Sequence, residues 1–231
     1  MPTHSQRLRQ KIELMMPRMR DAAGRVWNHP NFREVFPEFM FTIHSIIRAT
    51  HPSMKAAAAC AQARAANDPV AAAMARYLFE HADEEKGHDE WALADLEVLG
   101  MPAEEVSRRI PSPTVATLVG SQYYWMNHFH PVAYLSYIAV SEAPPSIDYL
   151  EEKVRTSGLP REAFRTWFYH GQLDHGHVQE FDELVDSLPL NEWHHSILGV
   201  NAFHSAELQA RAFEEVAEQY EASRAMTASP R

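Results

Sequence analysis

Three good metal ligands are spaced along one helix face in the segment YHGQLDHGHVQEF, residues 169–181. At 100° per residue, His170, Asp174 and His177 lie at roughly 0°, 40° and −20°, so their side chains point along one line. Imidazole and carboxylate groups on an apolar face need partners. The H-x3-D-x2-H pattern therefore predicts one wall of a metal site. The alternative is a set of core histidines paired with carboxylates from neighbouring helices.

The segment HADEEKGHDEW, residues 81–91, repeats this geometry. On a continuous helix, His81, Glu85 and His88 again lie at roughly 0°, 40° and −20°. Glu-x-x-His is the pairing that di-iron bundles project inward, because residues i and i+3 share a face and supply one oxygen and one nitrogen donor. Asp95 is predicted to orient the His88 imidazole. The alternative for this segment is a solvated charged face.

Glu142 is an isolated acid at the end of a long apolar segment, LSYIAVSEAPPS. Helix C-termini disfavour acids, which weakens the interpretation of Glu142 as a solvent-exposed helix end. We therefore expect Glu142 to be a further metal ligand that faces the predicted ligands in residues 81–88 and 170–177.

Substrate-binding residues are predicted on two other segments. In HSIIRATH, Arg48 shares a helix face with His44, and a guanidinium there suits a carboxylate group. The alternative is an Arg48 side chain that reaches the surface. Tyr124 and His128 are predicted to line a pocket, with ordinary core packing as the alternative.

The elements that must position these donors are helices, because helical spacing fills the segments between prolines. No segment has sustained strand alternation, and no linker divides the chain. The prediction is an all-α fold, a single-domain helical bundle of about seven to eight helices over residues 1–231, with a polar tail at about 224–231. The predicted helices cover residues 5–27, 34–50 (closed by His51-Pro52), 54–67, 69–99, 112–143 (kinked at Pro131), 160–188 and 191–223.

Composition excludes several classes of function. The formal charge of −10 argues against nucleic-acid and anionic-membrane partners. The single cysteine, Cys60, allows no internal disulfide and favours a cytoplasmic protein. No run of about 18 apolar residues exists that could span a membrane, and the first residues lack the apolar core of a signal peptide.

Taken together, these residues resemble the heme-oxygenase-like diiron oxidases and oxygenases. That fold is shared with heme oxygenase, thiaminase-type enzymes and the last enzyme of pyrroloquinoline quinone biosynthesis. The resemblance spans residues about 40–185, and phrases such as EEKGHDEW and PVAYLSYIAVSE are typical of it.

The family pattern is an acid seven residues before a histidine, a lone glutamate, then H-x3-D-x2-H. Here those positions are occupied by His81, His88, Glu142, His170, Asp174 and His177. His81 stands where the family has glutamate, and Glu85 or Glu84 is the alternative donor.

The resemblance implies a heme-oxygenase-like helical bundle that holds two Fe ions, with Mn as an alternative at one site, and activates O2. Mixed imidazole and carboxylate donors suit non-heme iron or manganese better than structural zinc. The implied substrate is a small carboxylate-bearing molecule, an amino acid or its derivative, with oxidative C–C cleavage, N-oxygenation or nitrile formation as outcomes. A homodimer and an external electron donor are also expected. The alternatives are a thiaminase-like hydrolase, which would need Cys60 as nucleophile, and a non-catalytic iron-binding protein.

Overall fold

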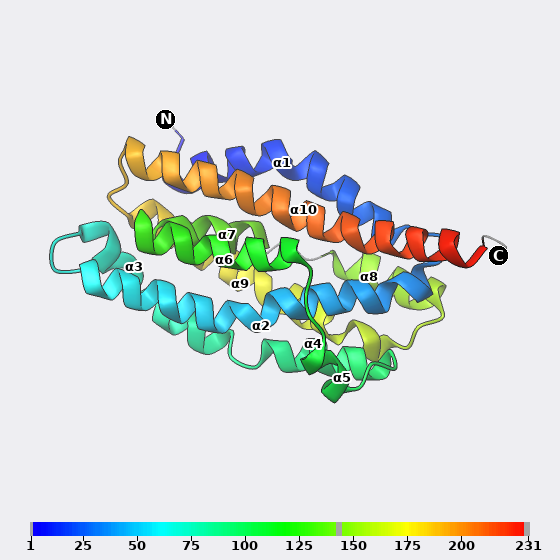
Figure 1. Ribbon diagram of the computed structural model, residues 1–231. Coiled ribbons are helices and arrows are strands. Elements are labelled where there is room, and N and C mark those ends of the chain that lie inside the picture. Colours follow the sequence, from blue (N-terminus) through cyan, green and yellow to red (C-terminus); the bar gives the residue numbers. More distant parts are fainter. Residues whose placement is uncertain (1, 142–144, 229–231) are drawn as a thin grey trace.

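The protein is an α-helical bundle (Figure 1). The computed structural model describes residues 2–141 and 145–228, and within the ninth helix it describes the backbone but not the side chains of residues 173–177. No strand forms in the described residues. The elements are α1 His4–Trp27, α2 Phe32–Arg64, α3 Pro69–Glu84, α4 His88–Val98, α5 Ala103–Arg108, α6 Pro113–His128, α7 Ala133–Ser141, α8 Ile147–Ser157, a 3-10 helix at Arg161–Phe164, α9 Arg165–Ser187 and α10 Glu192–Ala228.

The predicted number of helices is wrong, because ten α-helices form in the described part of the chain. The expected helix over residues 69–99 ends at Glu84 and restarts at His88, since Gly87 takes a left-handed conformation with φ 89°. The expected kink near Pro131 is a full break between α6 and α7. Two short helices, α5 and α8, also form in segments that were not predicted as helical.

Pro52 does not close a helix, contrary to the prediction, and α2 runs through it to Arg64. A proline inside a helix removes one N–H donor and weakens the preceding turn. Side-chain hydroxyls supply donors to carbonyls of that turn. Ser53 Oγ donates to the Ala49 carbonyl at 2.6 Å, and the Tyr134 hydroxyl lies 3.4 Å from the Thr50 carbonyl. These contacts let one 33-residue helix form the central wall of the bundle.

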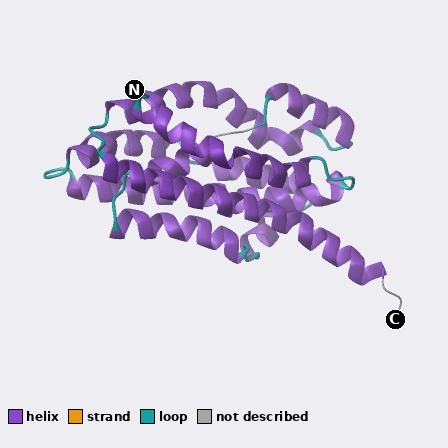
Figure 2. Cartoon of the chain, turned by 90° about the horizontal axis from the view of Figure 1, so that it is seen from above, coloured by secondary structure: helices purple, strands orange, loops and turns teal. Residues whose placement is uncertain are grey.

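Figure 1 shows α1 and α10 side by side along one edge of the bundle, with α4 and α5 at the opposite edge. Ion pairs such as Arg7–Glu192 and Arg18–Glu214 follow the α1–α10 contact. The last turns of α10 extend past the other helices (Figure 2), and residues 221–227 are exposed. No helix in the described ranges has the length and apolarity needed to cross a membrane.

An aromatic cluster fills the core where α1, α2 and α9 meet. Trp27 packs edge-on against Phe39 and Trp167, and the rings of Phe39 and Trp167 stack with centroids 5.7 Å apart. All three side chains are buried or half-buried. This cluster fixes the first turn of α9, and therefore the place at which His170 enters the bundle.

Candidate metal centre

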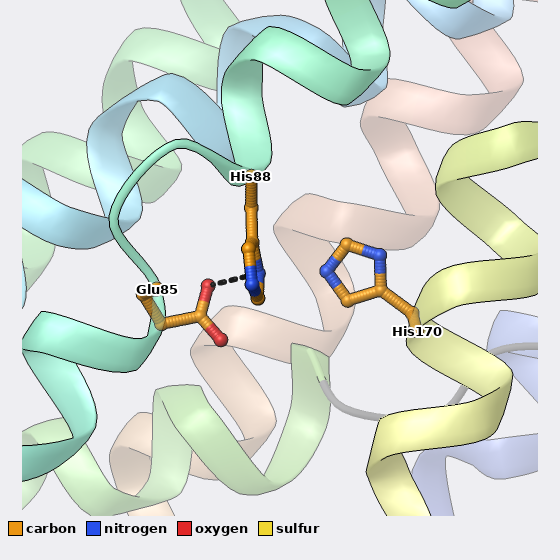
Figure 3. Close-up of side chains that lie close together, drawn as sticks. All are labelled: Glu85, His88 and His170. Atoms are coloured by element: carbon orange, nitrogen blue, oxygen red, sulfur yellow. Dashed lines mark ion pairs between the residues drawn. The ribbon is translucent and has the colours of Figure 1, made fainter.

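Glu85, His88 and His170 come together inside the bundle (Figure 3). Each offers one donor atom, and these atoms all lie within 4.8 Å of one another. Glu85 follows the last residue of α3, His88 opens α4, and His170 lies one turn into α9. Residues 85 positions apart in the sequence therefore form one cluster of potential ligands.

The break between α3 and α4 determines where Glu85 and His88 lie. Gly87 has φ 89°, a conformation that glycine adopts without the steric cost that a Cβ would bring. The chain turns there, and the Glu-x-x-His pair meets across the turn instead of along a continuous helix. The predicted pairing of Glu85 with His88 is thus present, although the predicted helix that was to carry it is not.

Glu85 is a buried carboxylate held in its charged form. Its side chain is 9% exposed, and one carboxylate oxygen lies 3.1 Å from His88 Nδ1, whose side chain is 5% exposed. Burial acts to raise the pKa of Glu85, but His88, His170 and His81 outweigh it, so the pKa lies below its ordinary value. The contact with His88 is short enough for an ion pair but is not aligned as a hydrogen bond. An ionised, poorly paired carboxylate is well suited to accept a cation.

His170 is oriented by the backbone of its own helix. Its Nδ1 lies 2.8 Å from the Thr166 carbonyl oxygen, which can only accept a hydrogen bond. Nδ1 therefore carries a proton, and Nε2 is the ring nitrogen that could bind a metal. Metal-binding histidines usually have this arrangement, in which the second nitrogen donates to a fixed acceptor.

Asp95 supports the start of α9 rather than His88, which corrects the prediction for this residue. Its carboxylate accepts a hydrogen bond from the Thr166 backbone N–H at 2.8 Å, and the residue is fully buried. Burial raises the pKa of Asp95 to about 6, against the opposing effect of the Thr166 donors and Arg165. Asp95 and His170 are thus joined through the two backbone groups of a single residue, Thr166.

His81 is buried but lies outside the cluster of three. Its Nδ1 is 3.1 Å from a Glu84 carboxylate oxygen, and its ring stacks on Tyr77. Of the donors predicted in residues 81–88, Glu85 and His88 lie close to His170. His81 forms a separate pair with Glu84.

Three predicted ligands cannot be placed. Glu142 lies outside the described residues, as do the side chains of Asp174 and His177. Their role as metal ligands stays a prediction.

A cavity of about 620 Å³ adjoins the cluster, and Glu85 and His170 form part of its wall. The remainder is largely methionine, isoleucine and aromatic side chains, with Arg20, Tyr137 and Gln209 among the polar exceptions. Burial raises the pKa of Tyr137 to about 12, so this phenol stays protonated at neutral pH. Sequence patterns did not single out these three residues, because each sits at an ordinary position in a helix and only the assembled cavity distinguishes it.

The four predicted substrate-binding residues do not line this cavity. His44 is buried, and burial followed by the charge of Arg48 lowers its pKa. Tyr124 and His128 lie on α6, where both are exposed and their ring centroids are 5.0 Å apart.

The donor set fits non-heme iron. Two imidazoles and one carboxylate from separate elements correspond to the 2-His-1-carboxylate arrangement, which leaves coordination positions open for O2 and substrate. A structural zinc site would instead be closed by four ligands, with thiolates common among them. Cys60, the one cysteine, does not line the cavity.

Comparisons with known proteins identify the family and the fold of this chain. The family of iron-containing redox enzymes matches residues 44–225. A domain of unknown function with a heme oxygenase-like fold from Shewanella denitrificans superposes with a TM-score of 0.79 at 20% identity, over 94% of this chain and 93% of that one. A TenA homolog from Pseudomonas syringae pv. tomato superposes with a TM-score of 0.65 at 12% identity, over 90% and 92%. No curated protein sequence matches. The predicted heme-oxygenase-like, all-helical fold is therefore confirmed, and the chain belongs to the family of iron-containing redox enzymes.

Proposed function

We propose that this protein is a non-heme iron oxidoreductase that uses O2 to oxidise a carboxylate-bearing small molecule. One observation carries the proposal: the cluster of Glu85, His88 and His170 adjoins a large apolar cavity, and Glu85 and His170 form part of the cavity wall. The donors alone would suit storage or transport of a metal. A cavity that reaches the donors gives a substrate access to the metal, which a catalyst requires.

Each residue of the centre has a distinct task in this proposal. Glu85 supplies the negative charge that offsets a divalent cation, since its neighbours hold its pKa low. His170 presents Nε2, because Thr166 occupies Nδ1. Tyr137 keeps its proton at the cavity wall and can donate a hydrogen bond there. The bound iron would supply the O2 chemistry, and the apolar wall would keep bulk water from it.

Two further parts of the proposal rest on the sequence. Glu142, Asp174 and His177 would complete the coordination and hold a second ion, iron or manganese. A homodimer and an external electron donor are proposed from the family resemblance. The substrate, an amino acid or an amino-acid derivative, is proposed from the same resemblance.

The test combines metal analysis with O2 uptake. Protein loaded anaerobically with Fe(II) should retain at least one iron per chain and consume O2 on exposure to air. His88→Ala and His170→Ala should each lower iron content at least tenfold, since loss of one of three ligands weakens the whole site. His204→Ala is the matched control, because His204 is a partly buried histidine of α10 outside the cluster.

Wild-type protein that cannot be loaded with iron or manganese would contradict the proposal. Iron retained without O2 uptake in the presence of any carboxylate would favour a non-catalytic iron-binding protein. The thiaminase-like alternative gains no support from the site, since Cys60 is directed to the Met126 carbonyl, 3.2 Å away, and does not line the cavity.

A further inference from the structure

The two histidines of the candidate metal centre are supported in different ways. His170 has a fixed hydrogen-bond acceptor, the Thr166 carbonyl oxygen, 2.8 Å from its Nδ1. For His88 the described residues provide no such acceptor: its buried Nδ1 forms no hydrogen bond with them, and its contact with Glu85 is an unaligned ion pair. Because Glu85 is itself a candidate ligand, its carboxylate is not free to orient this ring. A metal-binding histidine ordinarily has a partner that orients it, so another contact is expected to hold His88.

Trp91 makes that contact. Its indole and the His88 imidazole are stacked, with ring centroids 4.0 Å apart and planes inclined by 24°. This is the shortest distance between two ring centroids in the described part of the chain, where the next pairs are 4.8 Å apart. A ring packed this closely on one face of the imidazole leaves it little room to rotate. Trp91 therefore fixes the plane of the His88 ring.

The geometry of α4 places Trp91 over His88. His88 is the first residue of α4 and directly follows Gly87, whose backbone is left-handed, so no turn of the same helix precedes it. Side chains in a helix lean toward its N-terminus, and residues i and i+3 share a face. The Trp91 side chain thus reaches back onto His88. One turn of helix, with the sequence H-D-E-W, carries both the candidate ligand and the ring that holds it.

Trp91 also contacts the helix that carries the second histidine. Its ring meets Tyr169 edge-on at 5.0 Å and His170 at 5.8 Å between centroids. The His88 and His170 rings lie nearly perpendicular to each other, 5.0 Å apart, and Figure 3 shows them side by side. One indole therefore touches both imidazoles, although they come from different helices.

This support comes from outside the cavity. Glu85 and His170 line the cavity, whereas Trp91 and His88 do not. Trp91 is half-buried, and its neighbour Tyr169 is 41% exposed, so this side of the metal centre faces the protein surface. Trp91 can hold the histidine without occupying the side from which a substrate would approach.

We propose that Trp91 is a positioning residue of the metal centre, whose indole holds the His88 imidazole within reach of Glu85 and His170. A bound cation draws electron density from the imidazole, which gives that ring positive character against the electron-rich face of the indole. The stack should therefore favour the metal-bound state, and tryptophan should serve better than phenylalanine. This inference rests on the proposed function for the presence of a metal, but it can be tested by metal binding without turnover.

The experiment titrates metal-free protein with Co(II) under anaerobic conditions. The visible absorption bands of the bound ion report both its affinity and its coordination geometry. Trp91→Leu removes the ring, and Trp91→Phe keeps a smaller one. Tyr169→Leu is the control for packing, because it removes a ring from the same contact between α4 and α9 but leaves the stack on His88. All titrations are made below the melting temperature of the least stable variant.

A second control tests whether any pair of tryptophan and histidine affects metal binding. Trp193 is a 52% exposed residue of α10 whose ring packs against His194 with centroids 5.2 Å apart, outside the metal centre. Trp193→Leu should bind Co(II) as wild type does.

Trp91→Leu should weaken Co(II) binding about tenfold, the usual effect of removing a group that orients a ligand. Its absorption bands should differ from those of wild type in position or intensity, because His88 no longer has a fixed place in the coordination. Trp91→Phe should weaken binding only about threefold and keep the wild-type bands, since a ring still lies on the imidazole. Tyr169→Leu should match wild type in both measurements. If Trp91→Leu does not fold, the threefold loss in Trp91→Phe against none in Tyr169→Leu makes the same comparison.

Wild-type affinity and bands in the Trp91 variants would overturn the inference. So would an equal loss of affinity in Tyr169→Leu, which would show that Trp91 acts through the packing of α4 against α9. Both results leave the proposed function standing as long as iron loading and O2 uptake persist. Wild type that binds neither Co(II), Fe(II) nor Mn(II) would overturn both proposals. Trp91-dependent Co(II) binding by a protein that takes up no O2 when loaded with iron would support this inference and contradict the proposed function.

Discussion

Asp95 is a buried acid whose charge should cost stability at neutral pH. In the folded protein its pKa is raised to about 6 by burial, whereas the unfolded chain ionises near pH 3.8. Between these values the folded state keeps a proton that the unfolded state loses, so the contribution of Asp95 to stability falls as pH rises from 4 to 6. A difference of about two pKa units corresponds to roughly 3 kcal/mol.

Asp95→Asn should remove this cost and keep the bond to Thr166, since an amide oxygen can accept the same N–H. We expect the free energy of unfolding of the metal-free variant at pH 7.5 to exceed that of wild type by roughly 3 kcal/mol. The gain should fall to roughly 1 kcal/mol at pH 4.5. Urea denaturation at both values checks this, and an equal difference at the two values would contradict it.

At the level of single residues, sequence spacing predicted Glu85, His88 and His170 correctly as neighbours. The predicted ligands are three or four residues apart, and residues at this spacing stay close together even where the helix is locally broken. The role of Asp95 was not predictable, because its partner is a backbone N–H on a helix 71 residues away. Arg20 of the cavity wall was missed for a similar reason: α1 has four other arginines, and their ion pairs are visible only in the structure.

At the level of elements, two helical glycines should respond in opposite ways to an added methyl group. A Cβ at Gly24 in α1 would meet only Asn28 Nδ2, at 3.7 Å, whereas a Cβ at Gly171 in α9 would lie 2.9 Å from Ile147 Cδ1 on α8. Alanine has the higher helix propensity, so Gly24→Ala should raise the free energy of unfolding by about 0.5–1 kcal/mol. Gly171→Ala should lower it by about 1 kcal/mol, because the Ile147 side chain must leave its packed position.

Chemical denaturation of the two variants beside wild type makes the comparison, with each glycine serving as the control for the other. A gain in stability at both positions would show that α8 does not press on α9 at Gly171. A loss at both would show that the wall of the cavity near Gly24 has no room for a methyl group.

Helix starts were more predictable than helix ends. Asp68 accepts hydrogen bonds from the Val70 and Ala71 N–H groups and Pro69 follows it, in agreement with the predicted helix start at residue 69. The break at Gly87 was not predicted, because helical spacing continues on both sides of it. The turn of α2 before Pro52 also receives the hydroxyl of Tyr134, and local sequence carries no signal for a donor 82 residues away.

At the level of the whole molecule, the metal centre joins three helices, of which α4 and α9 are also linked by the hydrogen bond between Asp95 and Thr166. Glu85 follows the end of α3, His88 begins α4, and His170 belongs to α9, so one ion would connect these helices across the α3–α4 break. The unfolded chain does not hold these donors together. Metal binding should therefore stabilise the folded state by an amount that grows with the logarithm of the free metal concentration above the dissociation constant.

At Fe(II) or Mn(II) concentrations a thousandfold above the dissociation constant, the stabilisation should be about 4 kcal/mol. For a chain of this length that corresponds to a rise in melting temperature of about 8–16 °C. Differential scanning calorimetry under anaerobic conditions should show the rise for wild type and for His204→Ala. His88→Ala should melt at the same temperature with and without metal. A rise that persists in His88→Ala would contradict this prediction. The stabilising ion would then lie outside the cluster of Glu85, His88 and His170, which is the one such cluster among the residues whose side chains are described.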